Sequence, residues 1–434
     1  MRAVSLFSNC GAGDVGYRQA GFRFDVLAEL EPHRLSVAHL NHPEASPIEG
    51  DLRDTWPQVV SEYRRIAGDD RLDLLAACPP CQGMSTARGG RGRDSDVAAG
   101  GREPRNLLVL PIANVANALH PRLIVVENVS AFLTRKVPHP VSGEGIAAAR
   151  LLMELLADTY EVFPVILELA EYGVPQHRVR SFLTFVAKDE PVLKALLDAG
   201  RTPFPVPTHA PDHGGLTPVT IEDALLTFEL PWLDAASVET ATSNIPLHSV
   251  PTWDDDRYQW IASIPPDSGR SAWENSNCPK CGIVDVAEDA AICPICHGAL
   301  ARPTVRESDG RVRLVYGFKN SSYRRMAPDR PAATVTTASA RMGSDNTIHP
   351  WEDRVLSALE CQLLQTLPRE FKWGELQDRD YVALIREMIG EAVPPRFTEM
   401  HGFILAGLLR GEIRENTLPK SDRRCREARG RAGL

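Results

Sequence analysis

Three Cys-x-x-Cys pairs are the residues of this 434-residue chain whose types and spacing point most clearly to chemistry. Such a pair can supply half of a metal site, form a redox couple, or contain one reactive thiolate. Two of the pairs, CPKC at 278–281 and CPIC at 293–296, lie close together with the spacing C-x2-C-x11-C-x2-C. This is the ligand set of a closed tetrahedral zinc site, so a structural Zn²⁺ is predicted at Cys278, Cys281, Cys293 and Cys296.

The third pair, Cys78 and Cys81, lies alone in LLAACPPCQGMSTARGGRGR (74–93). It follows an apolar run and precedes a segment rich in glycine and arginine. The spacing alone does not show whether this pair is half of a metal site, a redox couple or the place of one reactive thiolate. The residues around it must distinguish these three alternatives.

A glycine loop near the start of the chain predicts a site for a nucleoside cofactor. The segment 4–22, VSLFSNCGAGDVGYRQAGF, reads as a strand, a turn and a helix start, and it contains G-x-G-x-x-G. Glu29 or Glu31 could then hydrogen-bond ribose hydroxyls. Nicotinamide dinucleotides and S-adenosylmethionine both need a close backbone and a ribose-binding carboxylate, so the loop alone does not choose between them.

The elements that must position these residues alternate between strands and helices over the first 187 residues. Strands are expected at Ala3–Phe7, Phe24–Ala28, Leu72–Ala76, Leu123–Val126, Val162–Leu167 and Phe182–Val186, and helices at Gly13–Ala20, His33–Leu40, Asn106–Leu119 and Gly145–Leu156. Apolar strands separated by helices indicate an α/β fold with a parallel sheet covered on both faces. Ligands bind beyond the carboxyl ends of such strands, and SNCGAG, Glu29, CPPC and ENV each follow a strand.

Length, charge and composition limit the class of protein. A chain of 434 residues is expected to form two domains, and no apolar run is long enough to span a bilayer. Nine cysteines, four of them clustered, fit a reducing compartment with a metal site better than a disulfide framework. The net charge of −9 argues weakly against a nucleic-acid partner, although arginines 88, 91, 93, 102 and 105 form a local basic cluster.

Three further motifs at expected strand ends indicate chemistry on a pyrimidine: PPCQ (79–82), VVENV (125–129) and YGVPQHRVRSF (172–182). A thiolate that adds to C6 of cytosine turns C5 into an enamine carbon, which can attack an electrophilic methyl group. The addition needs the charge on the ring to be offset, by a carboxylic acid at N3 or a guanidinium at O2. The candidates for these three roles are Cys81, Glu127 and Arg180.

Taken in order, these motifs resemble those of the DNA cytosine-5 methyltransferases over nearly the whole chain. The resemblance rests on Phe7–Gly13, Glu29, GDL with Asp51, PPCQGMS, ENV, QHRVR, RMAPDRPAATVTT, HPWEDRVLSALECQLLQTLP and IGEAVPP. It implies an enzyme that uses S-adenosylmethionine and methylates C5 of a flipped-out cytosine through a covalent bond between Cys81 and C6.

The resemblance also implies roles for individual residues. Cys81 is the nucleophile, Glu127 holds N3 and N4 of the base, and Arg180 contacts O2, with Arg178 and Gln176 in support. The implied cofactor site comprises Phe7, Ser8, Asn9, Cys10, Gly11, Ala12, Gly13, Glu29, Glu31, Asp51, Leu52, Pro79, Glu391 and Ala392. A loop that begins at the nucleophile can close over DNA and hold the flipped base, so DNA contacts are expected from Gln82, Ser85, Arg88, Arg91 and Arg93.

The family fold is a Rossmann-like methyltransferase sheet with a smaller target-recognition domain. We therefore expect a catalytic and cofactor-binding domain over 1–187, a target-recognition domain over 188–325 and a C-terminal part over 326–415 that returns to the catalytic domain. Residues 416–434 form a basic tail that is expected to be disordered. The zinc ribbon at 278–296 lies in the recognition region. We favour a role in stabilising this small domain over direct recognition of DNA bases.

Four positions depart from the family pattern. Asn9 replaces the first glycine of F-x-G-x-G, but asparagine tolerates a left-handed backbone, so the turn is expected to survive. Ser5 replaces a frequent aspartate, and Cys78 replaces a frequent glycine. We interpret Cys78 as a bystander in the reaction, because a redox pair needs a helix start that activates a thiol. Glu391 replaces an asparagine beside the cofactor pocket, where it could repel the methionine carboxylate or accept a hydrogen bond from a modified sulfonium donor.

Other functions on the same scaffold are cytosine-5 methylation of RNA and DNA binding without catalysis. The recognition domain and its zinc ribbon disfavour the first, and the intact Cys81, Glu127 and Arg180 disfavour the second. A function as a nicotinamide-dependent oxidoreductase is strongly disfavoured, because no motif other than the glycine loop points to nicotinamide binding. We expect a cytoplasmic, nucleoid-associated monomer that binds double-stranded DNA and no membrane, with a cognate restriction endonuclease as a candidate partner.

Overall fold

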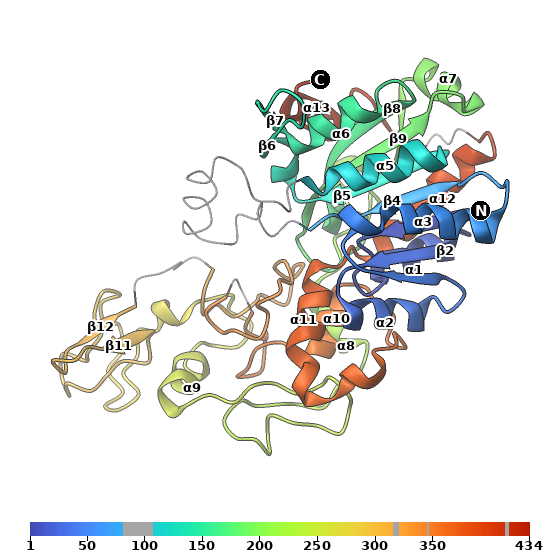
Figure 1. Ribbon diagram of the computed structural model, residues 1–434. Coiled ribbons are helices and arrows are strands. Elements are labelled where there is room, and N and C mark those ends of the chain that lie inside the picture. Colours follow the sequence, from blue (N-terminus) through green and yellow to red (C-terminus); the bar gives the residue numbers. More distant parts are fainter. Residues whose placement is uncertain (81–106, 316–320, 345–346, 413–415) are drawn as a thin grey trace. The chain divides into compact units, whose positions relative to one another are not determined.

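The computed structural model describes residues 1–80, 107–315, 321–344, 347–412 and 416–434, which belong to two compact units (Figure 1). The first unit comprises 1–173, 178–216 and 392–434, and the second comprises 174–177 and 217–391. None of the described helices is long and apolar enough to cross a membrane.

These limits differ from the predicted boundaries at 187 and 326. Strand β10 (Arg201–Pro205) pairs antiparallel with β13 (Thr417–Pro419), which ties the segment after residue 187 to the end of the chain. The return to the first unit begins at 392, at the start of the segment that leads into helix α12 (Pro395–Leu409).

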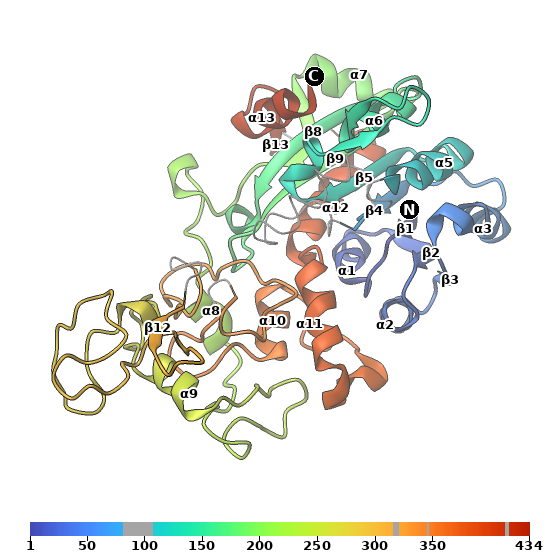
Figure 2. The same ribbon diagram turned by 60° about the vertical axis from the view of Figure 1, so that its left-hand side comes forward.

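A seven-stranded sheet forms the centre of the first unit, in the order β3-β2-β1-β4-β5-β9-β8 (Figure 2). The strands are β1 (Arg2–Leu6), β2 (Arg23–Glu29), β3 (Ser46–Glu49), β4 (Leu74–Ala77), β5 (Leu123–Asn128), β8 (Tyr160–Glu168) and β9 (Val179–Ala187). The strands β1 to β5 pair in parallel, whereas β9 runs antiparallel to both β5 and β8. The α/β prediction is confirmed, but a wholly parallel sheet was wrong, because only a short turn with the 3-10 helix η3 (Leu169–Tyr172) joins β8 to β9.

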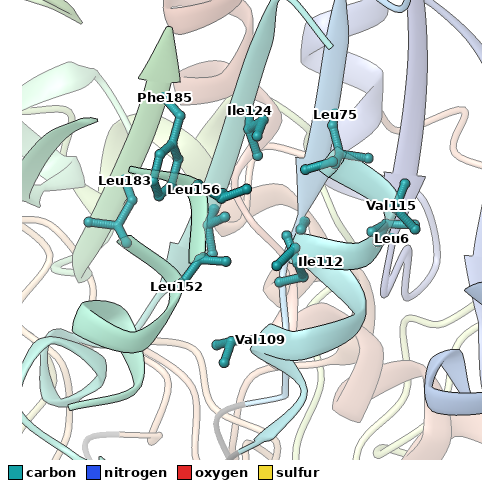
Figure 3. Packing of buried hydrophobic residues seen from close by; sticks show 14 of the residues in the cluster. Leu6, Leu75, Val109, Ile112, Val115, Ile124, Leu152, Leu156, Leu183 and Phe185 are labelled. Carbon is teal, nitrogen blue, oxygen red and sulfur yellow. The ribbon is translucent and has the colours of Figure 1, made fainter. Parts of the chain in front are cut away.

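Helices cover both faces of this sheet. On one face, α3 (Leu52–Ala67), α5 (Val109–Leu119), α6 (Ala148–Leu156) and α13 (Arg423–Ala432) share a buried apolar core with the strands. Figure 3 shows side chains of α5 and α6 packed against those of β4, β5 and β9 in this core. The opposite face carries α12, whose Phe397 ring lies 4.7 Å from that of Phe182 in β9.

The remaining elements of the first unit are shorter or lie at its edges. They are α1 (Ala12–Gln19), α2 (Pro32–Asn41), α7 (Pro191–Asp198), the hairpin strands β6 (Lys136–Pro138) and β7 (Gly145–Ala147), and the 3-10 helices η2 (Ser130–Leu133) and η4 (Pro211–His213). The predicted helix at 145–156 therefore begins as a strand and becomes helical only at Ala148.

The C-terminal tail is helical, not disordered as predicted. The side chain of Asp422 caps α13 by accepting a hydrogen bond from the Arg424 backbone N–H at 2.8 Å. The Arg424 guanidinium lies 2.6 Å from the Glu171 carboxylate, and Ala428 and Ala432 enter the core of the sheet. The basic composition of the tail concealed these small apolar positions.

The second unit has little regular structure. Its elements are α8 (Ile221–Leu226), α9 (Asp255–Ala262), η5 (Ala272–Glu274), β11 (Thr304–Arg306), β12 (Val312–Leu314), α10 (Ala358–Leu364), η6 (Gly374–Gln377), η7 (Arg379–Tyr381) and α11 (Val382–Glu391). A buried ion-pair network supports it: fully buried Arg354 lies 2.8 Å from Glu352 and 2.7 Å from Glu360. Ser357 and Glu360 also form the capping box that begins α10 at Ala358.

Candidate active site and metal cluster

The glycine loop between β1 and α1 has a left-handed backbone at three positions. The φ angles are 56° at Phe7, 49° at Asn9 and 74° at Gly11. Asparagine adopts this region more readily than most residues, and Asn9 does so where the family has glycine. The expectation that the turn survives the replacement is confirmed.

Glu29, at the carboxyl end of β2, holds this loop in place. Its carboxylate accepts hydrogen bonds from the backbone N–H of Asn9 at 2.8 Å, of Leu30 at 2.9 Å and of Glu31 at 3.2 Å. Burial raises the pKa of Glu29, and the backbone donors oppose that shift. Glu31 is exposed and precedes α2, so Glu29 is the acid that faces the loop.

Asp51 follows the neighbouring strand β3, close to Glu29 along the edge of the sheet. The Gly50 N–H donates to the Glu29 carbonyl at 3.0 Å, which brings the two strand ends together. The Asp51 side chain caps α3 by accepting from the Arg53 N–H at 2.9 Å, and hydrogen bonds from the Arg53 guanidinium lower its pKa. Leu52 is buried.

One thiol and one carboxyl group near the loop, those of Cys10 and Asp14, are buried. Burial raises the pKa of Cys10 to about 12 and that of Asp14 to about 7. Cys10 therefore carries its proton at neutral pH and is no candidate nucleophile, which agrees with its expected place in the cofactor loop.

Helix α12 approaches the loop so closely that glycine is required in α1. A Cβ on Gly16 would lie 2.2 Å from the Pro395 carbonyl, and one on Gly13 would lie 3.3 Å from the Val393 Cβ. The Thr398 hydroxyl donates to the Gly13 carbonyl at 2.7 Å. Gly16 is therefore required for the packing of α1 against α12, and a side chain at Gly13 would press against Val393.

His42 is a loop contact that the sequence did not reveal. This buried imidazole lies 2.9 Å from the Gly11 carbonyl through Nε2, and burial lowers its pKa. A carbonyl only accepts, so Nε2 carries the proton of a neutral ring. A histidine after the helix α2 carries no signal that could have predicted this.

The backbone strain at Asn9 gives a stability prediction. Asn9→Val should lower the free energy of unfolding by about 1–2 kcal/mol, because a β-branched residue is poorly tolerated at positive φ. Asn9→Gly is the matched control and should change it by less than about 0.5 kcal/mol. Denaturant titration of the three proteins measures the difference, and equal midpoints for valine and wild type would contradict the assignment.

Three side chains at the ends of three adjacent strands meet at the carboxyl edge of the sheet, and Cys78 is the residue that follows β4. Glu127 in β5 accepts a hydrogen bond from the Cys78 thiol, with Sγ and Oε2 2.9 Å apart. Its other oxygen lies 3.1 Å from Nε of Arg180, which projects from β9. Glu127 is 5 % exposed, so a nearly buried carboxylate is held between a thiol and a guanidinium.

Asn128, the middle residue of ENV, holds the backbone at Pro79. The side-chain Nδ2 of Asn128 donates to the Pro79 carbonyl at 2.8 Å. Its backbone carbonyl accepts from the Ser181 hydroxyl at 3.1 Å. The strand ends of β4, β5 and β9 are thus joined by side chains. The motif ENV pointed to the glutamate alone, and the structural use of its asparagine was missed.

Arg178 and Gln176 both form hydrogen bonds with backbone groups. Arg178 is 1 % exposed and donates from Nη2 to the Ala392 carbonyl at 2.8 Å, which links the residue before β9 to the segment before α12. In the second unit, Gln176 donates to the Leu364 carbonyl at 2.9 Å and accepts from the Val335 N–H at 3.1 Å. Of the two predicted arginines, Arg180 is the one whose guanidinium lies at Glu127.

Part of the predicted site lies outside the described residues. This holds for Cys81, Gln82, Ser85, Arg88, Arg91 and Arg93. Glu391 is the last residue of α11, in the second unit, and Ala392 is the first residue of the segment that returns to the first.

The two later Cys-x-x-Cys pairs converge as the spacing predicted. All four sulfurs lie within 4.8 Å of one another, with 3.6 Å between Cys278 and Cys296 and between Cys281 and Cys293. Four thiolates around one tetrahedral zinc ion lie about 3.8 Å apart, given Zn–S bonds of about 2.3 Å. The cluster could hold a metal ion.

Buried Arg302 organises the loop between these pairs. Its guanidinium donates to the carbonyls of Val286 at 2.9 Å and of Ala290 at 2.7 Å, and also to those of Asn275 and Ala287. The apolar core of this region is small and consists of Cys278, Val286, Cys293 and Leu300. A core of this size needs additional support, such as a metal.

A second group of potential ligands is already neutralised by the protein. His349, Glu352 and Glu360 lie within ligand distance of one another, but Arg354 donates to both carboxylates. Burial holds the pKa of His349 well below its usual range. This cluster is an internal ion-pair network.

Comparison with known proteins gives consistent results. The family model for C-5 cytosine-specific DNA methylases matches residues 1–402. The Type II methyltransferase M1.HgaI of Avibacterium volantium is 26 % identical over 91 % of this chain and 95 % of its own. M.AgeI of Thalassovita gelatinovora, also a Type II methyltransferase, is 27 % identical over 91 % of this chain and 96 % of its own.

Among solved structures, a DNA modification methyltransferase encoded within an E. coli prophage has a similar fold. It aligns with a TM-score of 0.55 over 94 % of this chain and 99 % of its own, at 18 % identity. At this identity the likeness concerns the fold.

Proposed function

The chain belongs to the family of C-5 cytosine-specific DNA methylases, and we propose that it methylates cytosine in double-stranded DNA through a covalent bond between Cys81 and C6. The main support is Glu127, held between the CPPC segment and Arg180 at the carboxyl edge of the sheet. This is the edge where ligands of open α/β sheets bind.

Each of the three residues has a distinct task. The Cys81 thiolate attacks C6, and electron density moves through the ring to C5. Glu127 hydrogen-bonds N3 and the exocyclic N4, and Arg180 neutralises charge at O2. After C5 has taken the methyl group, it loses its proton to a base, and elimination of Cys81 restores the aromatic ring.

The methyl donor would be held by the glycine loop and by Glu29, the acid that faces it. When bound, S-adenosylmethionine supplies an electrophilic methyl group on a sulfonium. The carboxylate of Glu29 already accepts three backbone N–H groups, which leaves one of its about four lone-pair sites, on Oε2, for a ribose hydroxyl. Phe7–Gly13 and Pro79 would line the site, with Asp51 at the adenine.

We assign the four-cysteine cluster to a structural Zn²⁺. Thiolates favour zinc among the abundant divalent ions, and four protein ligands leave no open coordination position for catalysis. The ion would hold the recognition region together without taking part in methyl transfer.

The partners are double-stranded DNA and, by analogy with the Type II methyltransferases that it resembles, a cognate restriction endonuclease. Gln82, Ser85, Arg88, Arg91 and Arg93 would contact the DNA around a flipped cytosine. The enzyme would act as a monomer at the nucleoid in the cytoplasm.

The test is a methylation assay on plasmid DNA and on transfer RNA in parallel, followed by mass spectrometry of the nucleosides and sequencing of modified cytosines. We expect 5-methylcytosine in DNA within one sequence context and none in RNA. Modification confined to RNA would contradict the proposal, and so would an inactive enzyme. A group heavier than methyl would identify a modified donor and explain Glu391.

A further inference from the structure

Cys78 contacts the carboxylate of Glu127 directly, although the sequence predicted that this thiol would be a bystander in the reaction. Its Sγ lies 2.9 Å from Oε2 of Glu127. The contact joins residues 49 positions apart, across the adjacent strands β4 and β5.

The backbone around this thiol is fixed on both sides. The Cys78 N–H donates to the Leu6 carbonyl at 3.2 Å, which extends the pairing of β1 with β4. The next carbonyl, that of Pro79, accepts from Asn128 at 2.8 Å. A thiol on a backbone held at both ends can keep one orientation at low entropic cost.

The two oxygens of Glu127 therefore have different neighbours. Oε1 faces Nε of Arg180 at 3.1 Å, and Oε2 faces Cys78. A carboxylate has about four lone-pair sites, so Oε2 can keep the thiol hydrogen bond and accept a second donor. The thiol can stay in place when a base arrives.

We propose that Cys78 is a positioning residue for methyl transfer: its S–H group fixes Oε2 of Glu127 in the orientation that receives the cytosine ring. This inference rests on the proposed function. It replaces the interpretation of Cys78 as a bystander, under which glycine at this position would leave methylation intact.

The expected effect lies in the chemical step. Cys78→Ala and Cys78→Gly should lower the single-turnover rate at saturating DNA three- to tenfold, with less than a twofold change in the KM for DNA. A weak donor to a charged acceptor accounts for this range. Cys78→Ser should recover most of the rate, because its hydroxyl can donate to the same oxygen.

A double-mutant cycle separates positioning from a general loss of structure. In a Glu127→Gln background, measured in single turnover at high enzyme concentration, adding Cys78→Ala should cost less than twofold, because the carboxylate that the thiol positions is gone. Equal losses in both backgrounds would overturn the proposal. Full activity of Cys78→Ala would do so as well.

Two controls keep the result interpretable. Cys425→Ala removes a different buried thiol, on α13, and should methylate at the wild-type rate. Thermal unfolding of each variant detects misfolding, and only variants with melting behaviour like that of wild type enter the cycle. A wild-type protein without activity would refute the proposed function, whereas an active wild type with an equally active Cys78→Ala would refute this inference alone.

Discussion

Replacement of Cys81 by alanine is expected to lower methyl transfer by at least about 10³-fold, because a covalent mechanism has no alternative nucleophile for C6. Cys10 cannot substitute for it, since burial raises the pKa of that thiol to about 12. Single-turnover assays with labelled donor and duplex DNA measure the effect.

The same variant should still bind DNA and S-adenosylmethionine, because neither site depends on the thiolate for affinity. Fluorescence anisotropy and calorimetry check this point, with Cys425→Ala as the matched cysteine control. A Cys81→Ala enzyme that keeps more than a tenth of the wild-type rate would exclude the covalent route.

Removal of the metal is expected to unfold the region around the four cysteines while the sheet of the first unit stays intact. Structural zinc contributes on the order of 10 kcal/mol to folding in small zinc domains, and the core formed by Cys278, Val286, Cys293 and Leu300 is too small to replace it. Hydrogen exchange after chelation should show lost protection over 276–302, where three carbonyls accept hydrogen bonds from Arg302.

A double substitution, Cys278→Ser with Cys293→Ser, should give the same exchange pattern and no bound metal. Elemental analysis should find one zinc ion per chain in wild type and in Cys425→Ala. Unchanged protection over 276–302 after complete removal of metal would contradict a structural role.

Much of the first unit could be predicted because its strands are apolar and its helices are spaced as in α/β folds. The elements that were missed or wrongly predicted each have a physical explanation. Strand β3 (Ser46–Glu49) has an exposed, proline-containing sequence, and α3 contains Pro57, so neither gave a clear periodic signal. The direction of β9 depends on the short turn that precedes it, and the tail folds because two alanines of α13 reach the core.

The sequence predicted which residues of the candidate site lie near one another, but not which of their side chains form contacts. The ends of neighbouring strands bring Cys78, Glu127 and Arg180 to the same edge of the sheet, which follows from the fold. Which side chain touches which depends on rotamers and local register. The sequence therefore singled out Arg180, but it could not reveal the hydrogen bond from Arg178 to the Ala392 carbonyl or the thiol of Cys78 beside the Glu127 carboxylate.

The central claim is covalent catalysis on cytosine by Cys81, and trapping on duplex DNA that carries 5-fluorocytosine at the mapped target tests it most directly. Fluorine at C5 cannot leave as a proton does, so the reaction should stop with the enzyme attached to the base. We predict an adduct that survives denaturation, contains one transferred methyl group, and joins the DNA to Cys81 in the peptide mass spectrum, with none formed by Cys81→Ala. No adduct from an enzyme that methylates ordinary DNA, or an adduct at another residue, would contradict the account.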